Sequence, residues 1–238
     1  MVSCMQIRID SAKCTVRSEG AFLGKNKFYD IWQYRDLNFE GGRIYGIVGE
    51  HGQGCEFLSY LLGGKVDFGN LQIYMDGNRI ERRDLECVSW NLEPAEEGYK
   101  KDMVCKSIKK ALTENHSTET FEEIQQKFAL TPERANRRLN QLSGERWRAS
   151  AALGYARGKR IFYAPYRTSS FYYAMCGSGL LKALRELADS GALVCLPVGS
   201  DRVMKYIADA CIYLDEEYEI DGLRRYYNEV FGGREYIR

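Results

Sequence analysis

Residues 43–64 read RIYGIVGEHGQGCEFLSYLLGG, and this stretch decides how the rest of the chain is interpreted. The nearly continuous apolar run Ile44–Val48 predicts a strand that is buried on both faces, as in a parallel sheet. A glycine-rich loop follows, and the segment from Cys55 predicts a helix that ends at Gly63 and Gly64. Strand, glycine loop and helix in this order are typical of a phosphate-binding loop.

The loop keeps the glycines of such a site but lacks its charged and metal-holding groups. Gly49, Gly52 and Gly54 stand where the pattern G-x-x-G-x-G-K-[ST] places glycine. Cys55 replaces the lysine, and Glu56 replaces the hydroxyl that would hold magnesium. A carboxylate about 4 Å from a phosphate oxygen costs roughly 4 kcal/mol at an effective dielectric constant near 20. We therefore expect weak nucleotide binding at this loop.

The two replacing side chains each have a functional and a structural interpretation. Glu56 opens a helix, where an acidic side chain gains roughly 0.3–1 kcal/mol from the free amides, so it is a candidate resident anion in an emptied phosphate cradle. The alternative is a solvated first-turn residue that leaves the cradle unfilled. Cys55 is either a thiol activated by the helix start or, the interpretation we favour, an inert half-buried cysteine. His51 is expected to be an exposed loop residue and not a ligand.

Composition limits the class of protein. The chain has 238 residues, of which 45% are hydrophobic and 28% charged, so we expect one folded domain over residues 1–238. The 34 basic and 33 acidic residues leave a net charge of +1, which gives no argument for a nucleic-acid partner. Eight cysteines without a C-x-x-C pair predict reduced thiols and no metal site. No apolar run approaches the roughly 18 residues of a membrane span, and the start of the chain lacks a signal-peptide core.

The remaining apolar patterns predict an α/β fold. Alternating segments at 5–9 and 31–34 predict antiparallel strands, and Asp76 with Gly77 predicts a hairpin between 71–75 and 78–80. Helical spacing across 103–138 predicts an inserted helical subdomain of about residues 94–150. The other expected elements are a strand at 85–90, a serine-capped helix starting near 142, strands at 160–163, 192–196 and 211–214, and helices at 180–188 and 203–208.

Taken in order, these segments resemble the nucleotide-binding domain of ABC transporters from about residue 5 to residue 220. The glycine loop stands at the Walker A position, and residues 140–150, NQLSGERWRAS, are similar to the LSGGQ signature and its helix. The segment 161–166, IFYAPY, takes the place of the Walker B strand and its Asp-Glu-Pro. Ser200 stands where the family has its switch histidine. The resemblance implies a P-loop NTPase-like core sheet with an antiparallel β subdomain and an inserted helical subdomain.

The resemblance also implies that catalytic groups of the family are missing. Ala164 cannot hold magnesium, and Pro165 cannot orient an attacking water. The histidines of the chain are His51 and His116, so none follows position 116 to act as the switch. We therefore expect no catalytic residue and no metal ligand, and no ATP hydrolysis by the chain alone.

The signature segment is the least altered of these motifs. Its residues are Leu142, Ser143, Gly144, Glu145 and Arg146, and relative to the family's signature one glycine is either deleted or replaced by Glu145. A helix that follows could direct amides at an anion, whereas the structural interpretation is a plain serine cap. Glu93 lies near the place of the family's Q-loop glutamine, and the alternative is an ordinary turn at 92–94.

Domains of this family work as head-to-tail pairs, in which each ATP lies between one subunit's Walker motifs and the other's signature. The resemblance thus predicts a non-catalytic subunit of a heteromeric ABC transporter, paired with an intact ABC ATPase subunit and docked on transmembrane subunits at the cytosolic face of the membrane. The only cofactor implied is Mg-ATP at a composite site with that partner. The alternatives are a soluble scaffold or regulatory module with the same fold, and a weak unconventional ATPase.

Overall fold

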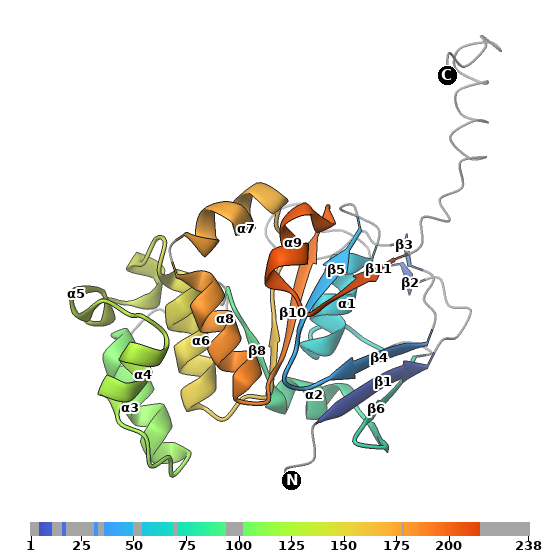
Figure 1. Cartoon of the computed structure of the whole chain (residues 1–238). Coiled ribbons are helices and arrows are strands. Elements are labelled where there is room, and N and C mark those ends of the chain that lie inside the picture. The colour runs from blue at the N-terminus through green and yellow to red at the C-terminus, as the bar shows by residue number, and fades with distance from the viewer. Residues whose placement is uncertain are drawn as a thin grey trace, which may run out of the picture.

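The computed structural model describes residues 5–10, 16–17, 31–32, 36–49, 54–68, 71–93, 102–177 and 179–214. The strands in this part of the chain form a five-stranded parallel sheet, a four-stranded antiparallel sheet and a two-stranded ribbon. Helices cover both faces of the parallel sheet (Figure 1). The predicted α/β fold is therefore confirmed, including its antiparallel β part and its group of helices.

The parallel sheet carries the predicted phosphate-loop strand between two others. Its strands, in spatial order, are β11 (Ala210–Tyr213), β5 (Ile44–Val48), β10 (Leu193–Val198), β9 (Ile161–Tyr163) and β8 (Ser89–Asn91). All neighbouring pairs run parallel, so the carboxyl ends of these strands meet at one edge. In open sheets of this kind, that edge is where ligands bind.

Both faces of the central strands are buried, which explains their uninterrupted apolar sequences. Along β10, Val194 and Leu196 belong to one hydrophobic cluster, whereas Leu193 and Cys195 belong to another. The second cluster includes α1 (Cys55–Leu62), which it joins to the antiparallel sheet. That sheet has the order β4 (Leu37–Glu40), β1 (Gln6–Asp10), β6 (Gln72–Met75) and β7 (Asn78–Ile80), and it contains the predicted hairpin. The ribbon pairs β2 (Val16–Arg17) with β3 (Ile31–Trp32).

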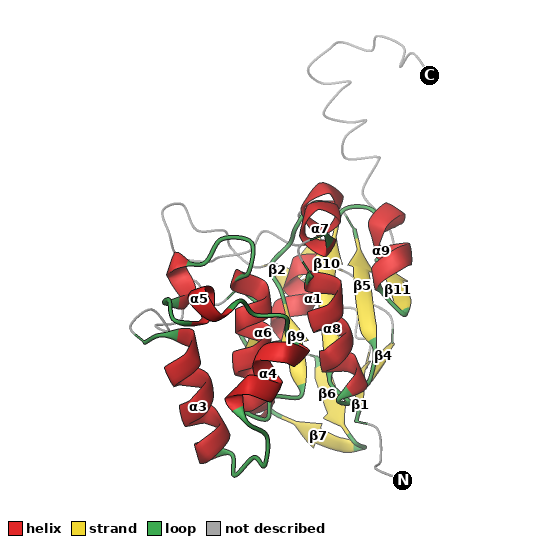
Figure 2. Cartoon of the chain, turned by 60° about the vertical axis from the view of Figure 1, so that its left-hand side comes forward, coloured by secondary structure: helices red, strands yellow, loops and turns green. Residues whose placement is uncertain are grey.

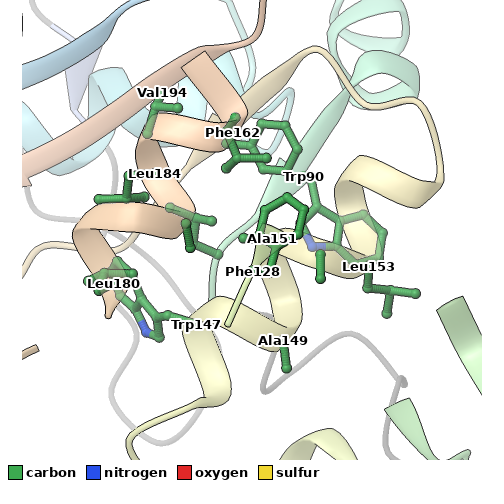
Figure 3. Close-up of a cluster of buried hydrophobic side chains, with 14 of the residues drawn as sticks. Trp90, Phe128, Trp147, Ala149, Ala151, Leu153, Phe162, Leu180, Leu184 and Val194 are labelled. Atoms are coloured by element: carbon green, nitrogen blue, oxygen red, sulfur yellow. The ribbon is translucent and has the colours of Figure 1, made fainter. Parts of the chain in front are cut away.

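The first cluster joins the other face of the parallel sheet to the helices. Its helices include α6 (Arg146–Ala156), α8 (Leu180–Asp189), α9 (Asp201–Ile207), α3 (Val104–Glu114) and α4 (Phe121–Lys127). Trp90 and Phe162 from the sheet lie beside α6 (Figure 3). Gly154 permits this close approach, because a Cβ there would come within 2.6 Å of both rings. The helices α3, α4 and α5 (Pro132–Ala135) lie away from the antiparallel sheet, and η1 (Leu139–Gln141) leads into α6 (Figures 1 and 2).

Two features differ from the sequence-based expectations. The predicted strand at 85–90 is wrong for most of its length, because α2 occupies Arg82–Val88 and the strand starts only at Ser89. The helix is favoured by Asp84, whose carboxylate accepts a hydrogen bond from the Glu81 amide at 2.8 Å at the helix start. The sequence analysis also did not predict α7 (Ser169–Cys176). No helix in the described part of the chain has the length and apolar character needed to cross a membrane.

Candidate functional site

The candidate site begins where β5 ends and α1 starts, at the carboxyl edge of the parallel sheet. Gly49 follows β5 and donates its backbone amide to Val198 O of β10 at 3.0 Å. Gly54 caps α1 with φ +90°, a left-handed conformation that favours glycine. His51 and Gly52 lie outside the described residues. The described part of the loop therefore keeps a backbone conformation that requires one of its glycines.

Cys55 occupies the place of the lysine, and it is fully buried, with 0% of its surface exposed. Its Sγ donates a hydrogen bond to Gly49 O at 3.4 Å. The prediction of a half-buried cysteine underestimated this burial, because the side chain points back onto the chain's own loop. No positive charge comes from position 55.

Glu56 reaches from the first turn of α1 to the segment that follows β9. Its Oε1 accepts a hydrogen bond from Tyr166 N at 3.0 Å, and its side chain is half-buried. The solvated alternative for Glu56 is therefore wrong. Ser59 strengthens the same junction, because its hydroxyl donates to Ala164 O at 2.7 Å and accepts from Ala164 N at 3.2 Å. The start of α1 is thus fastened to the segment predicted as the degenerate Walker B end.

Ala164 and Pro165 lie directly after β9, and neither offers a metal-binding group. Ala164 is completely buried. Tyr166 follows them and packs against Gly199, where an added Cβ would come 2.3 Å from the Tyr166 hydroxyl oxygen. A side chain at 199 would therefore collide with Tyr166. Among the described residues, no three histidine, cysteine or acidic side chains gather where they could hold a metal ion.

Ser200, at the predicted switch position, caps a helix. Its hydroxyl accepts a hydrogen bond from Arg202 N at 3.4 Å at the start of α9. Its carbonyl accepts from the Ser169 hydroxyl at 3.1 Å, which ties α9 to α7. These contacts account for Ser200 as a structural residue, because N-cap hydroxyls satisfy amides that a helix start leaves open.

The signature segment forms an exposed turn before α6, which we call the signature turn and define as residues 142–146. Leu142 is buried, Ser143 is exposed, and a Cβ added at Gly144 would meet nothing within 4 Å. The predicted serine cap is wrong: the helix begins at Arg146, Glu145 is its N-cap residue, and no side chain caps it. The cap does not form at Ser143 because its carbonyl accepts the Arg146 amide at 3.2 Å in a separate turn before the helix.

Glu145 turns away from the exposed side of the signature turn into the protein. Its carboxylate lies 3.2 Å from Arg148 Nη2, with both side chains less than 10% exposed. Thr131 donates to the same carboxylate from its hydroxyl at 3.1 Å, and Arg134 Nε lies 3.8 Å away. Burial lowers the pKa of the Arg148 guanidinium, and the charge of Glu145 opposes that shift. Glu145 is therefore an internal structural anchor of the signature turn.

Glu93 connects the end of β8 to two other segments. Its carboxylate accepts from Arg167 Nη2 in a short ion pair and from Trp147 Nε1 at 3.3 Å. Arg146 Nη1 lies 3.6 Å from its other oxygen. The Glu93 side chain therefore binds residues of two other segments, which a residue of an ordinary turn does not need to do. The sequence analysis did not identify Arg167, because no local motif indicates its role.

Comparison with known proteins supports the fold. No family profile matches the sequence, and no curated protein matches it. Among solved structures, a dimeric bacterial ABC transporter cassette, MJ0796, has a TM-score of 0.64 at 17% identity, covering 87% of this chain and 94% of its own. The protein cbiO1 from Clostridium perfringens, part of the ABC transporter complex cbiONQ, has a TM-score of 0.62 at 11% identity, with 94% of each chain covered. MJ1267, an ABC transporter cassette in its ADP conformation, scores 0.63 at 12% identity, covering 89% of this chain and 88% of its own.

The chain thus has the α/β fold of ABC transporter ATP-binding cassettes. The MJ0796 cassette has also been solved as a dimer in a post-hydrolysis state bound to ADP and Pi, with a TM-score of 0.63 at 16% identity. Identities this low establish a shared fold, whereas activity depends on the residues at the site.

Proposed function

We propose that this chain is a non-catalytic subunit of a heteromeric ABC transporter that contributes its signature turn to the ATP site of a partner subunit. One contrast carries the proposal. Cys55 and Glu56 bind the chain's own backbone, whereas Ser143 stands exposed just before α6. Among the described residues, the start of α1 is therefore held by internal contacts, while the Ser143 side chain faces solvent.

The chemistry at the start of α1 does not fit Mg-ATP. Phosphate binding at such a loop uses backbone amides together with a lysine and a metal ion. Cys55 supplies no charge, and the Glu56 carboxylate adds a negative one close to where phosphate would lie. Ala164 and Pro165 provide neither a metal ligand nor a carboxylate that orients water. We infer that the chain alone does not hydrolyse ATP.

The partner is an intact ABC ATPase subunit that supplies its own Walker motifs opposite the signature turn. The similar cassette MJ0796 forms dimers, and cbiO1 belongs to a transporter complex, which supports this assignment by analogy. Amides at the start of α6 would face the phosphates of the partner's Mg-ATP. In this assembly residues 1–238 act as one domain with a helical subdomain of about 94–150, docked on transmembrane subunits at the cytosolic face of the membrane.

The experiment uses the assembled complex, purified by a tag on this chain. Replacing Ser143 with Arg places a bulky charge at the proposed contact with the partner's γ-phosphate, so ATP turnover should fall to background. The matched variant Ser143→Ala should assemble equally well and retain most of the turnover. Size-exclusion chromatography checks that both variants still assemble.

Other outcomes favour the alternatives. Full turnover in an assembled Ser143→Arg complex, or failure of the chain to copurify with any transmembrane subunit, would contradict the proposal and favour a soluble scaffold or regulatory module. ATP hydrolysis by the purified chain alone that disappears on changing Glu56 would favour a weak unconventional ATPase.

A further inference from the structure

Glu93 joins three segments that are distant in sequence. It follows β8, and its own amide is held by Asn91 Oδ1 at 2.9 Å. Its carboxylate binds Arg167, from the segment after β9, and Arg146 and Trp147, from the start of α6. One carboxylate that is only 18% exposed thus connects the edge of the parallel sheet to the helix that follows the signature turn.

The contact with Arg146 extends to the signature turn itself. While Arg146 Nη1 lies near Glu93, Arg146 Nε donates to Leu142 O at 3.0 Å. The same guanidinium therefore binds both the carboxylate at the sheet edge and the carbonyl that opens the turn. Ser143 and Gly144 lie in sequence between Leu142 and Arg146, the two residues that this guanidinium connects. The Ser143 side chain is exposed, so burial does not hold the turn at this residue.

A second carboxylate holds the turn through different partners. Glu145 accepts from Thr131 and pairs with Arg148, so it ties the turn to the segment that precedes α5. Glu145 anchors the turn within the group of helices, whereas Glu93 anchors it to the parallel sheet. Charge-assisted hydrogen bonds of this kind are shorter and stronger than neutral ones, and paired guanidinium groups keep a fixed geometry.

We propose that Glu93 is a positioning residue that fixes the orientation of the signature turn relative to the parallel sheet in the free chain, before any partner binds. Loss of the carboxylate would leave the Arg146 and Arg167 guanidinium groups facing each other without an anion, and like charges repel. The turn would then detach from the sheet edge while the rest of α6 stays packed. For its consequence at a partner's ATP site, this inference rests on the proposed function.

The test is hydrogen exchange of the full chain, followed at the amides of residues 142–148. The isosteric variant Glu93→Gln removes the charge, and Glu93→Ala removes the side chain. Exchange at these amides should rise at least about tenfold in Glu93→Ala and by less in Glu93→Gln, because charged hydrogen bonds are among the stronger ones. Glu114→Ala is the control, since Glu114 is an exposed partner of Lys110 on α3 and should leave the turn unchanged.

Unchanged exchange at the turn in folded Glu93→Gln protein would overturn the inference, even if Glu93→Ala failed to fold. ATP turnover of the assembled complex provides a second measurement. With the turn mispositioned, the partner's kcat should fall about tenfold while assembly is retained, since misplaced groups cost catalysis more than binding. Raised exchange with unchanged kcat would support the positioning role and contradict the proposed function, so the two failures are distinguishable.

Discussion

The starts of α1 and α6 each carry an acidic residue, and the two carboxylates bind different parts of the chain. At α1, the Glu56 carboxylate accepts a hydrogen bond from Tyr166 N, in the segment that follows β9. At α6, Glu145 is buried and pairs with Arg148. Glu56 thus fastens its helix start to the edge of the parallel sheet, whereas Glu145 fastens its helix start within the group of helices.

The comparison also explains why both regions can be stable without a ligand. A helix N-terminus leaves backbone amides that need hydrogen-bond partners. Here Glu56 and Ser59 connect α1 to the end of β9, while Glu93 and Glu145 fasten the signature turn on both sides. Side chains of the chain itself thus hold the edge where a ligand binds in similar folds.

The largest expected effect concerns stability at α6. Glu145→Ala should lower the free energy of unfolding by about 3–5 kcal/mol, because it leaves the buried Arg148 charge without its partner. Glu56→Ala should cost only about 1 kcal/mol, since it removes a hydrogen bond from a half-buried side chain. Urea unfolding followed by circular dichroism measures both values.

The double variant Glu145→Leu with Arg148→Met provides the control for this difference. Replacing both members of a buried ion pair by apolar residues is often neutral or stabilising, so most of the lost stability should return. Equal losses in Glu145→Ala and Glu56→Ala would contradict the contrast between the two helix starts.

Thiol reactivity tests the start of α1 more directly. Cys55 and Cys195 are buried, and burial raises the pKa of the Cys195 thiol, whereas Cys87 is exposed. At pH 8, alkylation of Cys87 should therefore be at least about a hundredfold faster than that of either buried thiol. Peptide mass spectrometry at timed intervals measures the three rates. Rapid alkylation of Cys55 in the folded chain would mean an activated thiol at an open helix start.

Much of the fold follows from periodicity and turn residues. The strand Ile44–Val48, the hairpin at Asp76 and Gly77, and the helices within 103–138 are all confirmed, because each depends on local pattern. The helix at Arg82–Val88 was missed because its short apolar run also suits a strand, whereas the hydrogen bond from the Glu81 amide to the Asp84 carboxylate favours a helix start.

The site was less predictable, because its contacts join distant segments. Glu56 and Tyr166 are 110 residues apart, and Glu93 and Arg167 are 74 apart, so no local motif reports either contact. The sequence placed Ser143 and Gly144 at a helix start but assigned the serine a cap that it does not make. The direction of the Glu145 side chain depends on Arg148 and Thr131, whose contribution appears only after folding.

Partial repair of the α1 region should give a moderate effect. Cys55→Lys with Glu56→Ser supplies a cation and removes a negative charge, so Mg-ATP affinity should rise at least about tenfold. Hydrolysis should remain absent, because Ala164 and Pro165 are unchanged. Isothermal titration calorimetry compares the two proteins. Tight Mg-ATP binding to the unmodified chain, with no gain in the double variant, would contradict the charge argument.

The smallest expected effect is that of Glu56→Ala on turnover of the assembled complex. A line of contacts runs from Glu56 through Tyr166 and Arg167 to Glu93, which pairs with Arg146 of the signature turn. In this line Arg167 Nη1 donates to Tyr166 O at 3.2 Å, and Arg167 also pairs with Glu93. Contiguous contacts alone do not establish energetic coupling. Glu93 keeps its other donors, Arg146 and Trp147, when Glu56 is lost, so turnover should change less than about twofold.

Steady-state ATPase rates of the Glu56→Ala and Ser143→Arg complexes are compared at equal amounts of assembled complex. The comparison decides whether the two helix starts act independently. A small effect of Glu56→Ala together with complete loss in Ser143→Arg is expected if only the signature turn serves the partner's site. The contrary result is a large loss of turnover in the Glu56→Ala complex but not in a Glu56→Gln complex. Such a result would mean that the glutamine carboxamide still binds Tyr166 N, and that residues 166–167 transmit the effect of position 56 to the signature turn. The two helix starts would then be coupled through the edge of the sheet, and the start of α1 would regulate the partner's turnover.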